Sequence, residues 1–317
     1  MTEGSSNPIP HKQIHPGLQF LILMGILIAT IIAGNFIAGA IVVVRYGTDT
    51  LLDIANLKLG SQQVQSSLWT IQFIGTTLPI LVTPIIFAYR IVHDPDDYIK
   101  HHFDYPRLLM ALVFVAMLAV FPFIQYLGDL NSKMVLPEAL KGVEHWMRQS
   151  EDEAQKLSDT MMRMPTFWSM IYDLLFIGLL TAIVEEILFR GCFQTVFFRW
   201  TKNIHVAIWI TAILFSAFHQ EFYGFLPRLA LGLLFGYFTA WSGSIWPAIL
   251  AHFVNNGTVV VWTYLLQNNI TNLDPDKQKL FSNVIFVASF LATMLLLFFY
   301  KYISDKWQAA HHGEELD

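Results

Sequence analysis

Long apolar segments separated by short polar stretches make up most of the chain after residue 16. A transmembrane helix needs roughly 20 consecutive, mainly apolar residues. Segments of about this length or somewhat shorter lie at residues 17–44, 68–92, 108–127, 167–200, 204–218, 225–241, 245–266 and 280–303. The pattern predicts an all-α, polytopic membrane protein with about eight transmembrane helices, and an even number of spans places both termini on one side.

Residues 131–165 interrupt this pattern with a charged, helix-favouring stretch in which Pro137 precedes the helical residues. We expect an extramembrane amphipathic helix on or beside the bilayer. A solvated connector that does not contact substrate is the simpler interpretation of the same residues. The next segment, 167–200, is longer than a ~30 Å hydrocarbon core requires at ~1.5 Å per residue, so it must tilt, break or project.

The two ends of the chain are polar. We predict a disordered N-terminus at 1–16, a polar C-terminal tail at 304–317, and a single membrane domain at 17–303. The apolar run that begins at residue 17 is longer than the ~7–15-residue core of a signal peptide, so we expect it to be a retained first span. Acidic residues dilute the basic residues of the 131–165 helix, which favours cytoplasmic termini.

Composition supports a membrane location and argues against other classes of protein. Hydrophobic residues make up 55% of the chain and charged residues 14%, against roughly 25% charged residues in soluble domains. The formal net charge of -5, without a polybasic block, gives no support for nucleic-acid binding. The single cysteine, Cys192, lies in an apolar run, so we interpret it as a small apolar filler.

Three charged residues lie within the apolar stretch TAIVEEILFRGCF: Glu185, Glu186 and Arg190. A charge near the bilayer centre costs about 2.5–3.5 kcal/mol on insertion scales, so these residues need partners, water or a function. Residues four apart share a helix face, whereas consecutive residues point about 100° apart. We therefore expect Glu186 to pair with Arg190, and Glu185 to stay unpaired as a candidate general base.

Later segments carry polar residues that could meet Glu185. Phe215 lies four residues before His219 in FSAFHQ and can pack against its imidazole. In AHFVNNG, His252 and Asn256 are also four apart and project from one helix face. Each polar residue alone fits a helix–helix hydrogen bond. Together they favour a site between spans, because ionisable groups inside a membrane are functional candidates.

These motifs resemble the CPBP family of intramembrane proteases, which includes the type II CAAX prenyl endopeptidases and bacterial proteins linked to bacteriocin self-immunity. The family pattern is EExxxR, FxxxH and HxxxN in successive spans. This sequence has EEILFR, FSAFH and HFVNN in that order. The resemblance covers residues 183–256 and predicts a catalytic core within 166–266.

The resemblance implies a glutamate-dependent endopeptidase with a water-filled cavity that opens into the membrane. It implies that Glu185 and His219 activate a water molecule, and that His252 and Asn256 stabilise the oxyanion of the tetrahedral intermediate. The residues expected to support the site are Glu186, Arg190 and Phe215. We expect no cofactor and no metal. The expected partners are the lipid bilayer and a membrane-associated protein or peptide substrate, and the expected location is the plasma membrane of a prokaryote.

Other functions fit some of the same residues. A zinc hydrolase could use His219, His252 and a glutamate with water as the fourth ligand, but the sequence has no HExxH motif. A membrane scaffold of the immunity type would not need the unpaired Glu185. A transporter or proton relay would also use carboxylates and histidines, and Asp173 could contribute to it. The sequence has no GxSxG motif to support serine catalysis.

Overall fold

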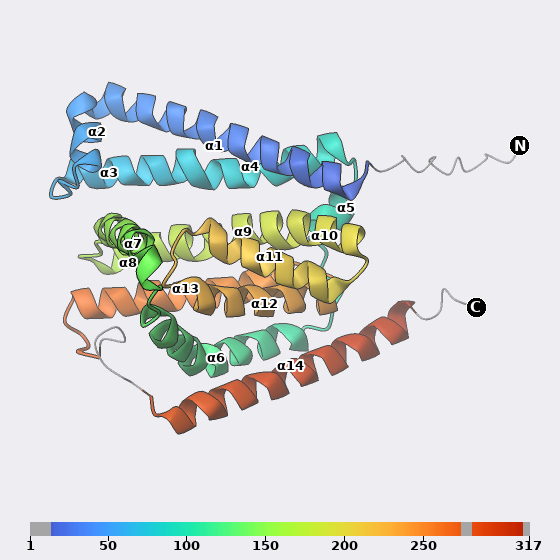
Figure 1. The fold of residues 1–317 in the computed structure, drawn as a ribbon. Coiled ribbons are helices and arrows are strands. Elements are labelled where there is room, and N and C mark those ends of the chain that lie inside the picture. Colours follow the sequence, from blue (N-terminus) through green and yellow to red (C-terminus); the bar gives the residue numbers. More distant parts are fainter. Residues whose placement is uncertain (1–13, 274–280, 313–317) are drawn as a thin grey trace, which may run out of the picture.

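The computed structural model describes residues 14–273 and 281–312, and every regular element in these ranges is a helix. This confirms the predicted fold class. The helices form a bundle, with α1 (Pro16–Tyr46) at one edge and α14 (Asn283–His312) at the other (Figure 1). The start of α1 and the end of α14 lie at the same end of the bundle. The predicted tails at 1–13 and 313–317 lie outside the described residues, and α14 includes residues 304–312 of the predicted polar tail.

Between these two helices the chain forms one continuous series of helical elements. In chain order they are α2 (Thr48–Ala55), α3 (Gln62–Thr70), η1 (Ile71–Thr77), α4 (Leu78–Ile86), η2 (Phe87–Ile91), α5 (Pro95–Ile99), α6 (Leu108–Ser132), η3 (Glu138–Leu140), α7 (Lys141–Met161), α8 (Phe167–Asp173), η4 (Leu174–Leu180), α9 (Thr181–Glu186), η5 (Ile187–Phe193), α10 (Gln194–Thr201), α11 (Ile204–Phe218), α12 (Phe225–Ser242) and α13 (Trp246–Gln267).

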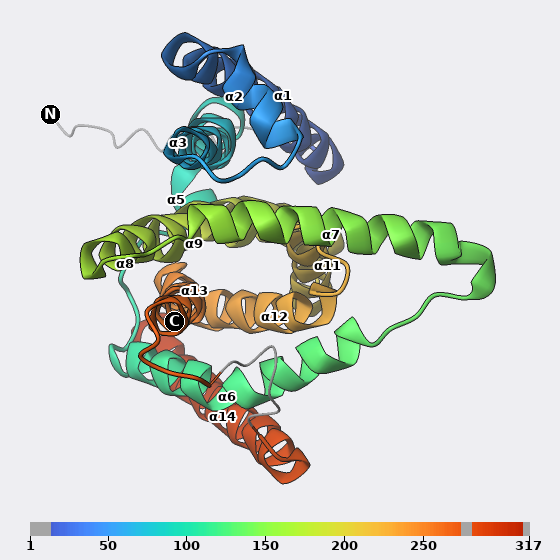
Figure 2. The same ribbon diagram turned by 90° about the vertical axis from the view of Figure 1, so that its left-hand side faces the viewer.

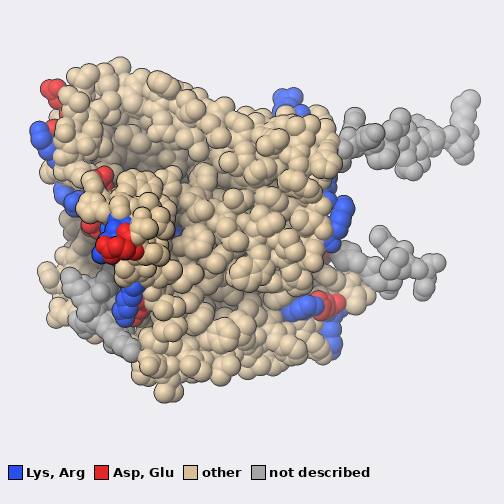
Figure 3. Space-filling model, viewed as in Figure 1, with Lys and Arg blue, Asp and Glu red and all other residues tan. Residues whose placement is uncertain are grey.

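All eight predicted spans are helical, but they differ in length. Six helices in the described part of the chain are long and apolar enough to cross a membrane, by length and composition. The other two, α11 and α12, are shorter, with 15 and 18 residues. Charged residues gather at the two ends of the bundle, and an uncharged band lies between them (Figure 3). The chain is an integral, multi-pass membrane protein.

The predicted extramembrane helix is present as α7, which crosses one end of the bundle (Figure 2). The preceding helix, α6, extends to Ser132, and the Asn131 side chain at its end is buried. Its amide donates to the Phe222 carbonyl at 3.0 Å and accepts from the Leu226 amide at 2.6 Å. The end of α6 is thereby fixed to the loop between α11 and α12.

The long apolar segment predicted at 167–200 is one helix of 35 residues, Phe167–Thr201. Two π-helical stretches, η4 and η5, flank the α-helical turns of α9. Each π-helical turn changes the rotational register of the side chains, and such turns are often found at functional sites. In this chain they lie on either side of the two adjacent glutamates.

Two glycines allow α12 to approach its neighbour closely. A β-carbon at Gly232 would lie 3.1 Å from the Ala212 β-carbon, and one at Gly236 would lie 2.7 Å from a methyl carbon of Ile208. Small residues at this spacing let two helix backbones pack together in a membrane. Gly232 and Gly236 of α12 thus allow α11 and α12 to pack in close contact.

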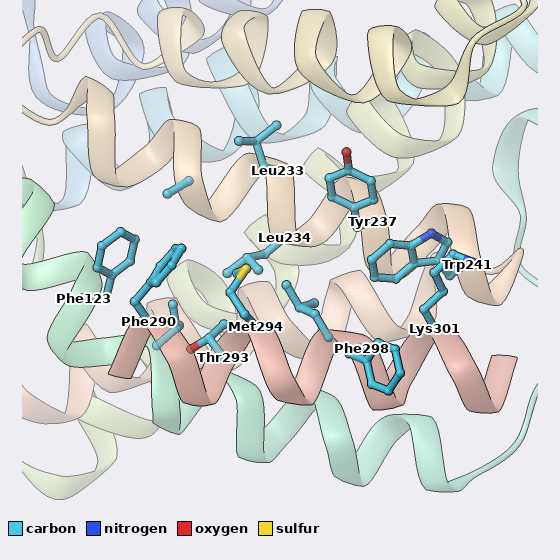
Figure 4. A pocket seen from close by; sticks show the side chains of 13 residues that line it. Phe123, Leu233, Leu234, Tyr237, Trp241, Phe290, Thr293, Met294, Phe298 and Lys301 are labelled. Atoms are coloured by element: carbon cyan, nitrogen blue, oxygen red, sulfur yellow. The ribbon is translucent and has the colours of Figure 1, made fainter. Parts of the chain in front are cut away.

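An apolar cavity of about 420 Å³ lies on another side of the bundle, between α6, α12 and α14. Phe123, Leu234, Phe290 and Met294 line one part of it, and Lys301 lies at one end (Figure 4). Its lining contains no carboxylate or imidazole. It contains none of the residues of the three sequence motifs.

Gly191 packs closely against the backbone of α5, and this close packing can be tested. A β-carbon at Gly191 would overlap the carbonyl oxygen of Tyr98, whereas one at Gly25 in α1 would meet no atom within 4 Å. We expect Gly191→Ala to lower the free energy of unfolding by about 1–3 kcal/mol. Gly25→Ala should be neutral or slightly stabilising. Thermal unfolding in detergent measures both, and equal stability of the two variants would contradict this account.

Candidate active site

The two adjacent glutamates of α9 lie in different surroundings, as the helix geometry predicts. The Glu186 side chain is fully buried, whereas that of Glu185 is 13% exposed and lines a cavity. The two side chains therefore differ in burial and in their access to the cavity.

Glu186 and Arg190 form the predicted ion pair. The Glu186 Oε1 and Arg190 Nη1 atoms are 2.8 Å apart, and Arg190 also donates from Nη2 to the Gly232 carbonyl at 3.0 Å. The guanidinium lies over the rings of Phe215 at 4.4 Å and Phe235 at 5.2 Å. Because both charges are buried, these contacts replace the water that they have lost.

His252 connects this pair to Glu185. Its Nδ1 lies 2.8 Å from Glu186 Oε1, and its ring stacks on Phe235 at 5.1 Å. Its Nε2 lies 3.9 Å from Glu185 Oε2. The structure thus brings His252 to both glutamates, whereas the sequence predicted that it could meet Glu185 but not that it contacts Glu186.

His219 faces Glu185 from the end of α11. Its Nδ1 lies 2.8 Å from the Phe215 carbonyl, which can only accept, so Nδ1 carries the proton and the Nε2 of the neutral ring is an acceptor. Phe215 packs edge-on against the imidazole at 5.0 Å, as predicted. Nε2 is 3.8 Å from Glu185 Oε2, which has no hydrogen-bond partner within the described residues. This separation exceeds a direct hydrogen bond.

Asn256 lies in the same cavity, which has a volume of about 520 Å³. Its Nδ2 donates to the Ile177 carbonyl at 3.3 Å. All four predicted catalytic residues therefore lie close together. Glu185, His219 and Asn256 line the cavity, and His252 Nε2 lies 3.9 Å from Glu185 Oε2. The remaining wall comes from α3, η1, η4, α13 and α7, including Trp69, Phe73, Phe176, Asn255, Leu157, Ser158 and Met161.

The contribution of α7 to this wall was not predicted. It makes α7 part of the site and argues against the simpler interpretation of residues 131–165 as a remote connector. Glu151 accepts from the Tyr223 amide at 3.0 Å, and Arg148 lies over the Tyr223 ring at 4.1 Å. Burial raises the pKa of Glu151, and the Tyr223 N–H opposes that shift. These contacts hold α7 against the loop between α11 and α12.

A larger cavity of about 1090 Å³ adjoins the first one beneath α7. The two share Ser158, Arg228 and Val259 in their walls. The larger cavity is lined by polar and charged groups, mainly from α7. Its polar lining contrasts with the aromatic residues in the wall of the first cavity.

Other singled-out residues lie outside this cluster. Asp173 is buried near the start of the same long helix and lines neither cavity. Cys192 is fully buried, with Sγ 3.8 Å from the Tyr98 carbonyl, which fits an apolar filler. Across residues 14–273 and 281–312, no group of three His, Cys, Asp or Glu side chains is arranged to hold a metal ion.

Comparison with known proteins shows what the segment that carries this cluster is similar to. A Bacillus subtilis (strain 168) protein described as Uncharacterized protein YpbD is 31% identical over 88 residues, which are 26% of this chain and 42% of that protein. The chain thus matches less than half the length of this relative. No solved structure gives a significant match. Residues 167–258, which contain every residue of the cluster, match the family model for type II CAAX prenyl endopeptidase Rce1-like, and this confirms the predicted resemblance over that segment.

Proposed function

We propose that this protein is an intramembrane endopeptidase of the glutamic type, which hydrolyses a peptide bond of a membrane-associated protein or peptide. The observation that carries the proposal is the position of Glu185 Oε2, 3.8 Å from His219 Nε2 and 3.9 Å from His252 Nε2, at a cavity that Asn256 also lines. The family match over residues 167–258 supports the same class of reaction.

In this proposal Glu185 and His219 hold and activate water. Glu185 and His219 each present a hydrogen-bond acceptor to the gap between them. A bridging water therefore donates one hydrogen bond to each of them and keeps its lone pairs for attack. The water oxygen bonds to the carbonyl carbon of the substrate while one water proton moves to Glu185. Glu185 then returns this proton to the nitrogen of the leaving amine as the C–N bond breaks.

Asn256 and His252 stabilise the oxyanion in this proposal. The Asn256 amide has a second N–H besides the one that binds Ile177, and this N–H is available to the oxyanion. His252 contacts Glu186 through Nδ1 and presents Nε2 to the side on which Glu185 lies, 3.9 Å from Glu185 Oε2.

The surroundings of the site support a substrate that lies in the membrane. Aromatic rings of Trp69, Phe73 and Phe176 form one wall, whereas the polar cavity beneath α7 supplies water. We further propose the plasma membrane of a prokaryote as the location, with cytoplasmic termini. The start of α1 and the end of α14 lie at the same end of the bundle, which fits two termini on one side of the membrane. Zinc catalysis is less well supported, because no metal-binding group of three occurs in the described residues.

The first prediction concerns Glu185. Profiling of new N-termini in membranes with the wild type should find cleavage products that disappear in Glu185→Gln, because the amide cannot accept the water proton. The products should persist in a metal chelator. The matched control is Asp173→Asn, which neutralises a buried carboxylate on the same helix outside the cluster and should leave the products unchanged.

Two outcomes would contradict the proposal in different ways. Loss of the products in chelator, with recovery on addition of zinc, would identify a metalloenzyme. If folded, abundant protein yielded no products that depend on Glu185, a scaffold or transporter function would explain the fold better.

A second prediction concerns Asn256. Loss of one oxyanion donor typically costs ~2.7–4 kcal/mol of transition-state stabilisation, so Asn256→Ala should lower kcat about a hundredfold or more. The peptide cleaved by the wild type and spared by Glu185→Gln is the substrate for this measurement. The control is Asn35→Ala, which removes an asparagine of α1 that donates a hydrogen bond to the Gly75 carbonyl in η1. Wild-type turnover in Asn256→Ala would exclude Asn256 from the mechanism.

A further inference from the structure

Asn255, the residue before Asn256, makes an unusual contact with it. The Asn255 Nδ2 donates to the Asn256 Oδ1 at 3.1 Å. Side chains of consecutive helical residues point about 100° apart and do not normally face each other. Helix geometry alone therefore does not explain this bond, which requires both side chains to turn toward a common point.

The two contacts of Asn256 fix which end of its amide faces which neighbour. The Ile177 carbonyl only accepts hydrogen bonds, so the amide end 3.3 Å from it is the NH₂ group. The Oδ1 end then faces Asn255, which must supply a donor and does so with its own NH₂ group. Because 3.3 Å is slightly beyond the usual N–H···O range, the bond from Asn255 is the tighter of the two constraints.

Asn255 is also placed to do this without occupying the site. It lies in the walls of both the catalytic cavity and a neighbouring cavity of about 540 Å³ between α6 and α13. Asn255 is partly buried, and it contacts Asn256 through its NH₂ group rather than through its Oδ1. Asn255 can therefore hold its neighbour from the side opposite Ile177.

We infer that Asn255 is a positioning residue for peptide hydrolysis. It holds the Asn256 amide with Oδ1 turned away from the reacting carbonyl, so that the free N–H of Asn256 stays directed to the oxyanion. The inference rests on the proposed function, and it adds a residue at an unspecified position of the HxxxN motif. Asn255 would act only through Asn256, and this distinguishes it from a residue that merely stabilises the fold.

A double-mutant cycle tests this dependence. Asn255→Ala removes one neutral hydrogen bond and should lower kcat about threefold to tenfold, with KM unchanged because the oxyanion forms only in the transition state. In the Asn256→Ala background, the same substitution should have no further effect on kcat. Equal losses in both backgrounds, or a rise in KM alone, would overturn the inference. The substrate is again the peptide whose cleavage depends on Glu185.

Asn255→Asp sharpens the test because a carboxylate can accept but not donate. It should drive the Asn256 amide to turn its NH₂ group toward residue 255, so kcat should fall further than in Asn255→Ala. The new charge could also affect Glu185 directly, but that effect would persist in the Asn256→Ala background. A loss that vanishes in that background therefore reports the orientation of Asn256.

A spectroscopic readout separates this inference from the proposed function. In protein labelled with ¹⁵N-asparagine, the side-chain NH₂ signals that disappear in Asn256→Ala belong to Asn256. We expect these signals to shift in Asn255→Ala and to shift differently in Asn255→Asp. Unchanged signals would overturn the inference whether or not the protein cleaves a peptide, whereas absence of cleavage alone would count only against the proposed function.

Discussion

The buried ion pair between Glu186 and Arg190 constrains the rest of the site. Two charges taken out of water carry a penalty that their mutual attraction offsets only when the remaining donors and acceptors also find partners. Here the Gly232 carbonyl, two aromatic rings and the His252 imidazole supply some of those partners, whereas Glu186 Oε2 and Arg190 Nε have no hydrogen-bond partner within the described residues. These groups come from α11, α12 and α13, so satisfying one pair of charges fixes three helices around α9 and η5.

Locking one glutamate leaves the other available. Because consecutive helical residues point in different directions, Arg190 pairs with Glu186 and leaves Glu185 without this partner. Glu185 faces His219 and the cavity instead, with an oxygen that has no hydrogen-bond partner in the described ranges. His252 contacts Glu186 through one nitrogen and approaches Glu185 with the other. The structural pair thus positions a group beside the candidate base without consuming it.

Much of this cluster could be predicted from sequence because local helix geometry determines it. The four-residue spacing was sufficient to predict the Glu186–Arg190 pair and the packing of Phe215 on His219. Contacts that depend on tertiary packing were not accessible in this way. The bond from His252 to Glu186 joins α13 to α9, and the placement of α7 depends on contacts with the loop after α11. The doubled asparagine in AHFVNNG was visible in the sequence, but its hydrogen bond was not.

The position of α7 bears on a physical difficulty of the proposed hydrolysis within a bilayer, which is that the reaction consumes water where water is scarce. Trp69, Phe73 and Phe176 form an aromatic part of the cavity wall. Polar residues of α7 line the adjoining cavity, which shares Ser158 and Arg228 with the first one. The cavity at Glu185 therefore has an aromatic wall on one part and a polar neighbouring cavity beneath α7. This arrangement gives the charged insertion a reason to lie over the site, and the pattern of apolar segments alone could not reveal it.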